Sequence, residues 1–383
     1  MSALPRQSLG SLSLFSRSAN RDSQAGQIAG QIRNVKRPRF ALVAAVLAAT
    51  ALGSGSFATA DEPAKKKEEV AAGPWITQVR WLDDQNLLGT ESQGLLFRSG
   101  KVIKTTAADT SKLETIAEQD VSVWAVVPLA DGKVAASNYK GEVYVQGGGD
   151  PQKFESASRW IRALEKAPGD KDLLAGTEDG KLVVLSVADK KETKRIDAHG
   201  AAVFDIAFNT AGDRVASVAG DGSVKVWSWP ALEPVSSGTR GKDALWAVAF
   251  TSDGSQLVTG GADRRIRLWD TASGKFLLNI TTTSDWVTSL ASVPGGSLVV
   301  GGSMNGQLIV VDTTAKLPVT KMAGPGSGIW SVSMSPSGKQ LAVATRKHGI
   351  ALVSADSWQA AAKETAERAA SEKPPAPAPK QPK

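Results

Sequence analysis

The sequence of 383 residues contains no cysteine and two histidines, His199 and His348. Without cysteine the chain forms no disulfide, has no thiol nucleophile and cannot bind zinc or an iron–sulfur cluster through thiolates. Two histidines are too few for a histidine-rich metal cage. The lack of cysteine does not indicate a compartment, because such a chain suits oxidising and reducing compartments equally.

The short motifs that mark common enzymes are missing as well. The chain has no P-loop, no G-x-S-x-G elbow, no H-E-x-x-H and no EF-hand loop. No acidic cluster recurs at one position of the sequence that would indicate a calcium site. His348 lies in the turn Lys347-His348-Gly349, where a solvated side chain is expected. The sequence therefore predicts no catalytic residue, no metal and no cofactor.

Positive charge is scarce outside the N-terminal segment. The chain has 45 Lys and Arg against 38 Asp and Glu, but residues 1–60 hold seven of these basic side chains and one of the acids. Residues 61–383 therefore carry a net charge of +1. A domain this close to neutral has no basic stripe that could follow a phosphate backbone, so nucleic acid is not expected as a partner.

Residues 33–60 have the pattern of an export signal. Basic residues 33–39 precede an uncharged apolar run over residues 40–52, and an A-x-A exit ends at Ala60. The run is short and alanine-rich for a spanning helix, which needs about 20 apolar residues. We expect a leader over residues 1–60 that is cleaved before Asp61, and an exported protein that is periplasmic, extracellular or envelope-associated. A membrane anchor formed by residues 40–60 and an organellar transit peptide are the alternatives.

Between this leader and the C-terminal tail the chain repeats itself with a period of about 42 residues. Each copy has an alternating strand, a polar turn and two further strands. One position near the start of the first strand aligns all copies, and we call it the anchor position. It is occupied by Thr77, Trp124, Arg162, Phe204, Trp246, Thr288 and Trp330. The sequence thus contains seven copies between about residues 73 and 356.

The copies resemble the WD-repeat family of β-propellers. Trp269-Asp270 is a literal Trp-Asp pair at the end of a third strand, Trp227-Ser228 is a near copy, and Val311-Asp312 keeps the aspartate. The resemblance implies an all-β fold, a seven-bladed propeller of four-stranded blades over residues 61–357. It also implies that residues 66–72 supply the outer strand of the last blade and so close the ring.

The chain ends in a segment rich in Ala, Pro and Lys. Residues 360–372 suit a solvated helix, because Glu364, Arg368 and Glu372 are spaced four apart, but they have no large apolar stripe. Residues 374–383 are typical of a polyproline spacer. We expect residues 358–383 to be a flexible tail, helical in its first part and polyproline-like in its last.

The resemblance also implies a structural tetrad. In the family, buried Trp, Ser or Thr, His and Asp side chains connect the strands of a blade. The fourth copy has all four at the family spacing: His199, Ser217, Asp221 and Trp227. The fifth has three: Thr259, Asp263 and Trp269, with Gly241 in place of the histidine. The other copies have lost most of the tetrad, so apolar packing must hold their strands together.

An aromatic residue recurs at the start of the first strand in every copy. Four lie at the anchor position and three lie two residues earlier, which keeps all seven on one strand face. They are Trp75, Trp124, Trp160, Phe204, Trp246, Trp286 and Trp330. Two interpretations remain open: an exposed ring that binds a partner on the top face, or a buried top layer of the core.

These observations favour a non-enzymatic interaction scaffold, a monomeric propeller that binds a protein or peptide partner on the top face. A small-ligand or glycan receptor is the first alternative, since tryptophans can stack on sugars and hold cations. A propeller hydrolase or lyase is the second, although the sequence shows no residues for its chemistry.

Overall fold

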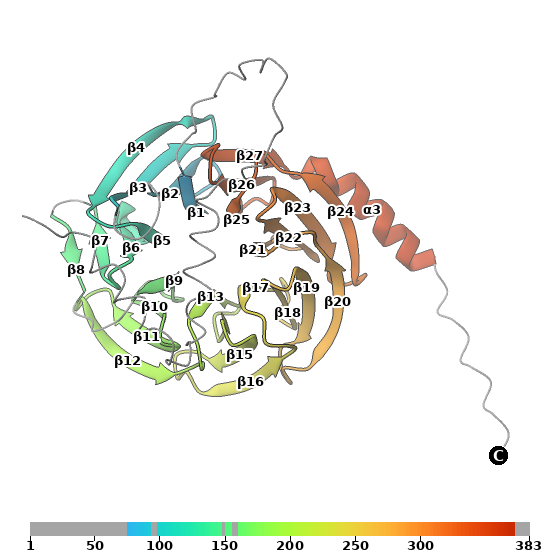
Figure 1. Cartoon of the computed structure of the whole chain (residues 1–383), viewed down its shortest axis with the longest axis horizontal. Coiled ribbons are helices and arrows are strands. Elements are labelled where there is room, and N and C mark those ends of the chain that lie inside the picture. The colour runs from blue at the N-terminus through green and yellow to red at the C-terminus, as the bar shows by residue number, and fades with distance from the viewer. Residues whose placement is uncertain (1–74, 93–97, 148–149, 155–159, 372–383) are drawn as a thin grey trace, which may run out of the picture. The chain divides into compact units, whose positions relative to one another are not determined.

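The computed structural model describes residues 75–92, 98–147, 150–154 and 160–371. Within these residues, 27 strands form seven antiparallel sheets arranged as the blades of a ring, with the first strand of each blade innermost (Figure 1). The predicted all-β, seven-bladed propeller is therefore confirmed. The leader over residues 1–60 lies outside the described residues.

The blades follow one another along the chain. Blade 1 consists of β1 (Trp75–Trp81), β2 (Asn86–Ser92), β3 (Gly100–Thr106) and β4 (Asp109–Gln119). Blade 2 consists of β5 (Val123–Pro128), the short 3-10 helix η2 (Ala130–Gly132), β6 (Val134–Asn138), β7 (Val143–Gln146) and β8 (Gln152–Lys153). Blade 3 consists of β9 (Ile161–Lys166), β10 (Asp172–Thr177), β11 (Lys181–Ser186) and β12 (Lys191–Asp197).

The remaining blades lie closer to the 42-residue period. Blade 4 consists of β13 (Val203–Phe208), β14 (Arg214–Ala219), β15 (Ser223–Ser228) and β16 (Pro234–Thr239). Blade 5 consists of β17 (Leu245–Phe250), β18 (Gln256–Gly261), β19 (Arg265–Asp270) and β20 (Phe276–Thr282). Blade 6 consists of β21 (Val287–Ser292), β22 (Leu298–Ser303), β23 (Gln307–Asp312) and β24 (Leu317–Ala323). Blade 7 consists of β25 (Ile329–Met334), β26 (Gln340–Thr345) and β27 (Ile350–Ser354). We call the edge where each inner strand begins the upper edge of the propeller.

Every inner strand carries a β-bulge at the anchor position. In each blade the pairing register between the first and second strands skips one residue, and that residue is the anchor residue. A bulge leaves its residue outside the ladder and redirects its side chain. The repeat seen in the sequence is therefore also a repeat of backbone geometry near the upper edge.

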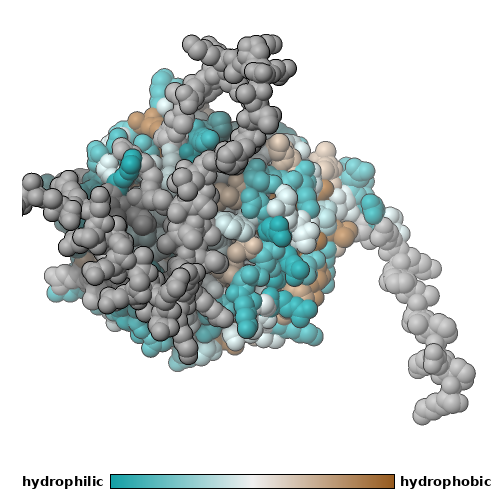
Figure 2. Space-filling model, in the orientation of Figure 1, coloured by the Kyte–Doolittle hydropathy of each residue, from teal (hydrophilic) through white to brown (hydrophobic). Residues whose placement is uncertain are grey.

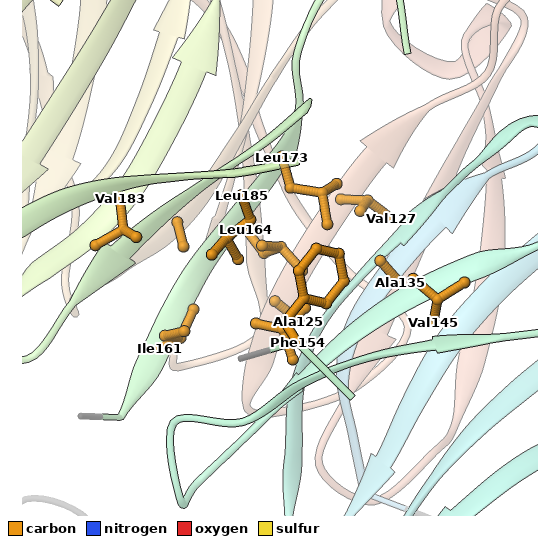
Figure 3. Packing of buried hydrophobic residues seen from close by; sticks show 12 residues of the cluster. Ala125, Val127, Ala135, Val145, Phe154, Ile161, Leu164, Leu173, Val183 and Leu185 are labelled. Atoms are coloured by element: carbon orange, nitrogen blue, oxygen red, sulfur yellow. The ribbon is translucent and has the colours of Figure 1, made fainter. Parts of the chain in front are cut away.

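The blades are held together by apolar side chains packed between neighbouring sheets. Figure 3 shows the cluster between blades 2 and 3, where Phe154, fully buried just after β8, lies among side chains of both sheets. Ala125, Leu164 and Leu173 come from strands of the two blades. Such burial contributes about 25 cal/mol for each Å² of apolar surface removed from water. This packing agrees with the loss of the tetrad from most copies.

Blades 1 and 7 are in direct contact, which closes the ring. The indole N–H of Trp81 donates to the carbonyl of Ser333 at 2.9 Å, and the hydroxyl of Ser331 accepts from the amide of Val79 at 3.3 Å. Three strands of blade 7 are described. The predicted fourth strand, residues 66–72, lies outside the described residues.

The chain leaves blade 7 in a helix, α3 (Asp356–Ser371), which lies beside β24 at the periphery (Figure 1). Trp358, in its first turn, is completely buried in the apolar cluster of blades 6 and 7. The boundary predicted at residue 357 thus falls inside a helix whose first turn belongs to the core. No helix in the described part of the chain is long and apolar enough to cross a membrane.

On the face of the propeller that Figure 2 shows, the described residues in view are mostly hydrophilic or neutral. Among the large hydrophobic side chains of the described residues, those of Val235 and Leu317 are exposed. Two isolated exposed side chains are ordinary for a soluble surface.

Candidate functional site

The recurrent aromatic residues meet at the upper end of the central channel. Trp124, Trp160, Phe204, Trp246 and Trp330 are buried, with 5–7% of their surface exposed. Trp75 and Trp286 are half-buried. If the aromatics at the anchor position bind a partner directly, they should be partly exposed. They are instead more deeply buried than Trp75 and Trp286, which lie two residues before the anchor position in their copies.

The rings pack on one another across blade boundaries. Trp330 lies 5.5 Å from Trp75 and 6.2 Å from Trp124, measured between ring centroids, and Trp124 lies 5.6 Å from Trp160. On the other side, Trp246 lies 5.7 Å from Phe204 and 5.4 Å from Trp286. These are favourable distances for tilted aromatic pairs. We call the seven residues the aromatic ring.

Arg162 joins the two halves of the aromatic ring. Its guanidinium carbon lies 4.9 Å from the ring of Phe204, 5.0 Å from that of Trp246 and 5.5 Å from that of Trp124. Burial lowers the pKa of Arg162 to about 10, and the nearby carboxyl of Asp205 opposes this effect. A cation held over three ring faces contributes to closing the upper end of the channel.

Most indole N–H groups of the aromatic ring lack a hydrogen-bond acceptor. Within the described residues, the buried Nε1 atoms of Trp75, Trp124, Trp160, Trp246 and Trp330 have no partner. An unpaired buried donor is costly, although neighbouring aromatic faces can accept an N–H weakly. The ring therefore gains its stability from apolar contact rather than from hydrogen bonds.

Below the aromatic ring, one pair of opposite charges spans part of the channel. Arg80 of blade 1 and Glu165 of blade 3 form an ion pair in which both terminal guanidinium nitrogens, Nη1 and Nη2, donate to the carboxylate. Burial alone would lower the pKa of Arg80, but the carboxylate of Glu165 raises it above the usual value. Blade 2 lies between blades 1 and 3 and has the uncharged Val127 at the aligned position, so the ion pair connects two blades that are not neighbours.

The other side of the channel is open. A cavity of about 500 Å³ is lined mainly by blades 4 to 7, including Asp205, Ser289 and Ser331, and it extends to Arg80 and Glu165. The side chains at this level connect neighbouring blades, because each accepts a hydrogen bond from a backbone N–H of the next inner strand. The pairs are Gln78 with Val126, Asp205 with Val248, Ser289 with Val332, and Ser331 with Val79.

Asp205 is the acidic member of this polar layer. Burial raises the pKa of Asp205 to about 7, with a further increase from Glu165, while the N–H groups of Val248 and Ile206 and the charge of Arg80 act in the opposite direction. Its carboxyl accepts both amides at 2.9 Å. A carboxyl that titrates near neutrality inside a cavity is a candidate binding group.

The raised pKa of Asp205 predicts a pH-dependent stability. A carboxyl whose pKa is about 7 in the folded state and about 3.9 in the unfolded state makes the protein lose stability as pH rises from about 4 to about 7. The variant Asp205→Asn lacks this loss, so we expect its stability relative to the wild type to be higher at pH 8 than at pH 5. Denaturant unfolding at both pH values measures the difference. An identical difference at the two pH values would show that Asp205 titrates normally.

The predicted tetrad of blade 4 comes together with one additional link. Trp227 Nε1 donates to Ser217 Oγ at 2.9 Å, and Ser217 Oγ lies 2.7 Å from His199 Nε2. His199 Nδ1 contacts Ser223 Oγ at 2.8 Å, and Ser223 donates to Asp221 at 2.6 Å. His199 Nδ1 and Asp221 Oδ1 are 3.8 Å apart, which is too far for a direct hydrogen bond, so the hydroxyl of Ser223 connects them. Burial lowers the pKa of His199, which favours the neutral ring.

Removing His199 should destabilise blade 4. His199→Ala leaves Ser217 and Ser223 without their common partner, and we expect a loss of about 1–3 kcal/mol in the free energy of unfolding. His348 is exposed in its turn, and His348→Ala should change the stability by less than about 0.5 kcal/mol. Chemical denaturation of both variants checks this, and equal losses would contradict the assignment.

Blade 5 replaces the missing histidine with an arginine. Trp269 Nε1 donates to Thr259 Oγ1 at 2.8 Å, as in blade 4. The carboxylate of Asp263 forms an ion pair with Arg267, whose side chain is 4% exposed and which also donates to the carbonyl of Arg240 at 3.1 Å. Gly241, at the histidine position, therefore leaves Asp263 with a different buried partner.

No group of three or more His, Asp or Glu side chains that could hold a metal occurs among the described residues. Sequence reasoning missed Arg80, Glu165 and Asp205 because none of them belongs to a motif that recurs in the seven copies. A signal was present: Arg80 and Glu165 both lie three residues after the anchor position, where the other copies have small or apolar residues.

Comparison with known proteins agrees with this geometry. The family model for the WD domain, G-beta repeat, matches residues 190–228, 233–270 and 274–312. These three segments cover the outer strand of blade 3 and most of blades 4 to 6, where the period is regular. No curated protein matches the chain significantly.

Proposed function

Because this chain belongs to the WD-repeat family of β-propellers, whose members generally bind proteins and typically catalyse no reaction, we propose that it is an interaction scaffold. In this proposal a protein or peptide partner binds at the upper edge of the propeller, over the aromatic ring. The observation that carries the proposal is the ring itself, which gathers one aromatic side chain from every blade at one end of the channel.

The degree of burial divides the ring into a floor and a contact surface. The five buried rings support the half-buried Trp75 and Trp286, which lie on blades 1 and 6, on either side of blade 7. Arg346 of blade 7 lies 5.4 Å from the ring of Trp75, and Lys347 and His348 next to it are exposed. Half-buried tryptophans beside cationic side chains are typical of the residues that dominate binding energy.

Crosslinking and pull-down from envelope extracts test this proposal. We expect Trp75→Ala/Trp286→Ala to lose a partner that the wild type retains. Trp229→Ala is the matched control, because Trp229 is also half-buried but packs against Phe208, 5.2 Å away, near the end of the inner strand of blade 4. Equal capture by the wild type and both variants would overturn the proposal.

We also propose that this binding occurs outside the cytoplasm, after cleavage before Asp61. The support comes from the basic flank, apolar run and small-residue exit over residues 33–60. Mass spectrometry of the protein recovered from its own cells should find an N-terminus at Asp61. Recovery of a membrane-bound chain that retains residues 40–60 would favour an uncleaved anchor instead.

A small polar ligand in the channel is a second candidate function, favoured by the cavity of about 500 Å³ that Asp205 lines. Its lining combines serine, threonine and charged side chains with apolar ones, which suits a small molecule that carries both hydroxyl groups and an apolar face. Ala249→Leu would fill part of this cavity and should abolish any co-purified ligand detected by native mass spectrometry. Retention of the ligand would place it elsewhere.

A further inference from the structure

One turn at the upper edge of blade 5 differs from the same turn in blades 2, 3, 4, 6 and 7. The turn from the second to the third strand contains a residue with positive φ in blades 2 to 7. Glycine fills the place in five of them: Gly141, Gly180, Gly222, Gly306 and Gly349. Blade 5 has Arg264 there, with φ +63°. A left-handed conformation costs a residue with a Cβ about 1–2 kcal/mol.

The glycine positions are also crowded by the chain entering the next blade. A Cβ at Gly180 would lie 2.2 Å from the carbonyl oxygen of His199, and one at Gly306 would lie 2.3 Å from that of Gly326. Blade 5 keeps the same turn, in which the amide of Thr283 donates to the carbonyl of Arg264 at 2.7 Å. The chain around this turn therefore leaves room for an arginine where blades 3 and 6 exclude any side chain.

Arg264 belongs to a basic pocket. A concavity of about 340 Å³ at this edge is lined by Arg240, Arg264, Arg265 and Arg267 together with Asp243 and Asp263. We call it the arginine pocket. The ion pair between Arg267 and Asp263 is internal. Arg264 and Arg265 are exposed and form no ion pair with any described residue, and Arg240 lies 4.6 Å from the ring of Phe276.

The arginine pocket carries more positive charge than the rest of the propeller would suggest. Once Arg267 and Asp263 neutralise each other, Arg240, Arg264, Arg265 and the adjacent Lys242 face one remaining acid, Asp243, a net charge of +3. Residues 61–383 as a whole carry +1. A strained arginine without a salt bridge is a feature that proteins retain at functional sites.

The arginine pocket lies beside the aromatic ring. Thr283, which binds the carbonyl of Arg264 through both its amide and its hydroxyl, precedes Trp286 by three residues. A partner seated over Trp286 would therefore reach the pocket. The pocket spans one blade of a nearly neutral ring, which is too short to follow a phosphate backbone.

We propose that the arginine pocket binds an acidic segment of a protein partner, with consecutive Asp or Glu side chains paired to Arg240, Arg264 and Arg265. This inference rests on the proposed function and adds the chemistry of the partner. Guanidinium groups bind carboxylates through two parallel hydrogen bonds, which gives direction as well as charge. Such contacts raise association rates and weaken with added salt.

A fluorescein-labelled octaglutamate peptide, titrated with the purified propeller and followed by fluorescence anisotropy, tests the proposal. Arg264→Gly/Arg265→Gln removes two charges and places glycine where the backbone favours it, so folding should be retained, as thermal melting will show. We expect binding about fivefold to tenfold weaker than for the wild type, and weaker binding by the wild type at about 150 mM salt than at low salt. An octaserine peptide should not bind.

Lys275→Gln/Lys339→Gln is the matched control. Both lysines are exposed in turns at the lower edge and the charge change is the same. Equal weakening by the two double variants would overturn the proposal, as would tighter binding of a single-stranded oligonucleotide of equal charge.

The pull-down separates the acidic-segment inference from the proposed function on which it rests. If Trp75→Ala/Trp286→Ala loses the partner but Arg264→Gly/Arg265→Gln does not, the acidic-segment inference fails alone. If the arginine variant loses octaglutamate while the tryptophan variant keeps the partner, the proposed function fails alone.

Discussion

Replacing Trp246 with alanine is expected to lower the free energy of unfolding by about 3–5 kcal/mol, the usual range for a large aromatic residue in a packed interior. Trp246 is buried and lies against Phe204, Trp286 and the guanidinium of Arg162. Its loss would leave a cavity that the rigid inner strands cannot close. Chemical denaturation of the variant measures the effect.

A phenylalanine at the same position separates packing from hydrogen bonding. The Nε1 of Trp246 has no acceptor within the described residues, so Trp246→Phe removes no hydrogen bond and should cost about 1–2 kcal/mol. Trp269→Phe is the control, because Trp269 donates to the buried Thr259 hydroxyl. Leaving that hydroxyl unpaired should add about 1–3 kcal/mol. Equal costs at both positions would mean that Trp246 has a partner in solution.

The fold could be predicted from the sequence because the repeat is encoded in several independent ways. The alternating strands, the glycine-rich turns and the 42-residue spacing all agree for blades 4 to 6. Phe204 and Trp246 are one repeat period apart in the sequence, and each is the bulged residue of its inner strand. The repeat of the backbone bulge persists in the blades that have lost the Trp-Asp pair.

The sequence predicted where the candidate site lies, but not how deeply its side chains are buried. Alternation places Trp124 and Trp330 at the channel end, yet it does not show that they reach across to each other, 6.2 Å apart. That contact joins blades 2 and 7, which are not neighbours along the chain. Whether an aromatic ring is exposed depends on such contacts and on Arg162, whose anchor position places it at the channel end but does not show that it stacks on three rings.

Local substitutions were equally hard to foresee. The sequence shows Gly241 at the place of the tetrad histidine, so the tetrad of blade 5 lacks one member. The structure shows instead that Arg267, from the third strand, pairs with Asp263. In blade 4, Lys225 stands at the corresponding position and donates to the carbonyl of Ala198. A change of partner between strands is visible only when the side chains are placed.

Removing Arg267 should therefore produce one of the largest losses of stability in the protein. Arg267→Met leaves the carboxylate of Asp263, whose side chain is 8% exposed, without its cation. A buried charge left unpaired in this way typically costs about 3–5 kcal/mol. The loss should exceed that of His199→Ala in blade 4, because the histidine there is neutral and its removal leaves hydroxyl groups rather than a charge.

The double variant Arg267→Met/Asp263→Leu should recover most of this loss. A buried ion pair replaced by apolar side chains of similar volume is often neutral or stabilising, and the buried Nε of Arg267 already lacks an acceptor among the described residues. The carbonyl of Arg240, freed by the change, belongs to an exposed residue that water can reach. Denaturant midpoints and slopes of the single and double variants measure the coupling. A double variant as unstable as Arg267→Met would show that Arg267 stabilises blade 5 through its bond to Arg240 or its packing, and not through Asp263.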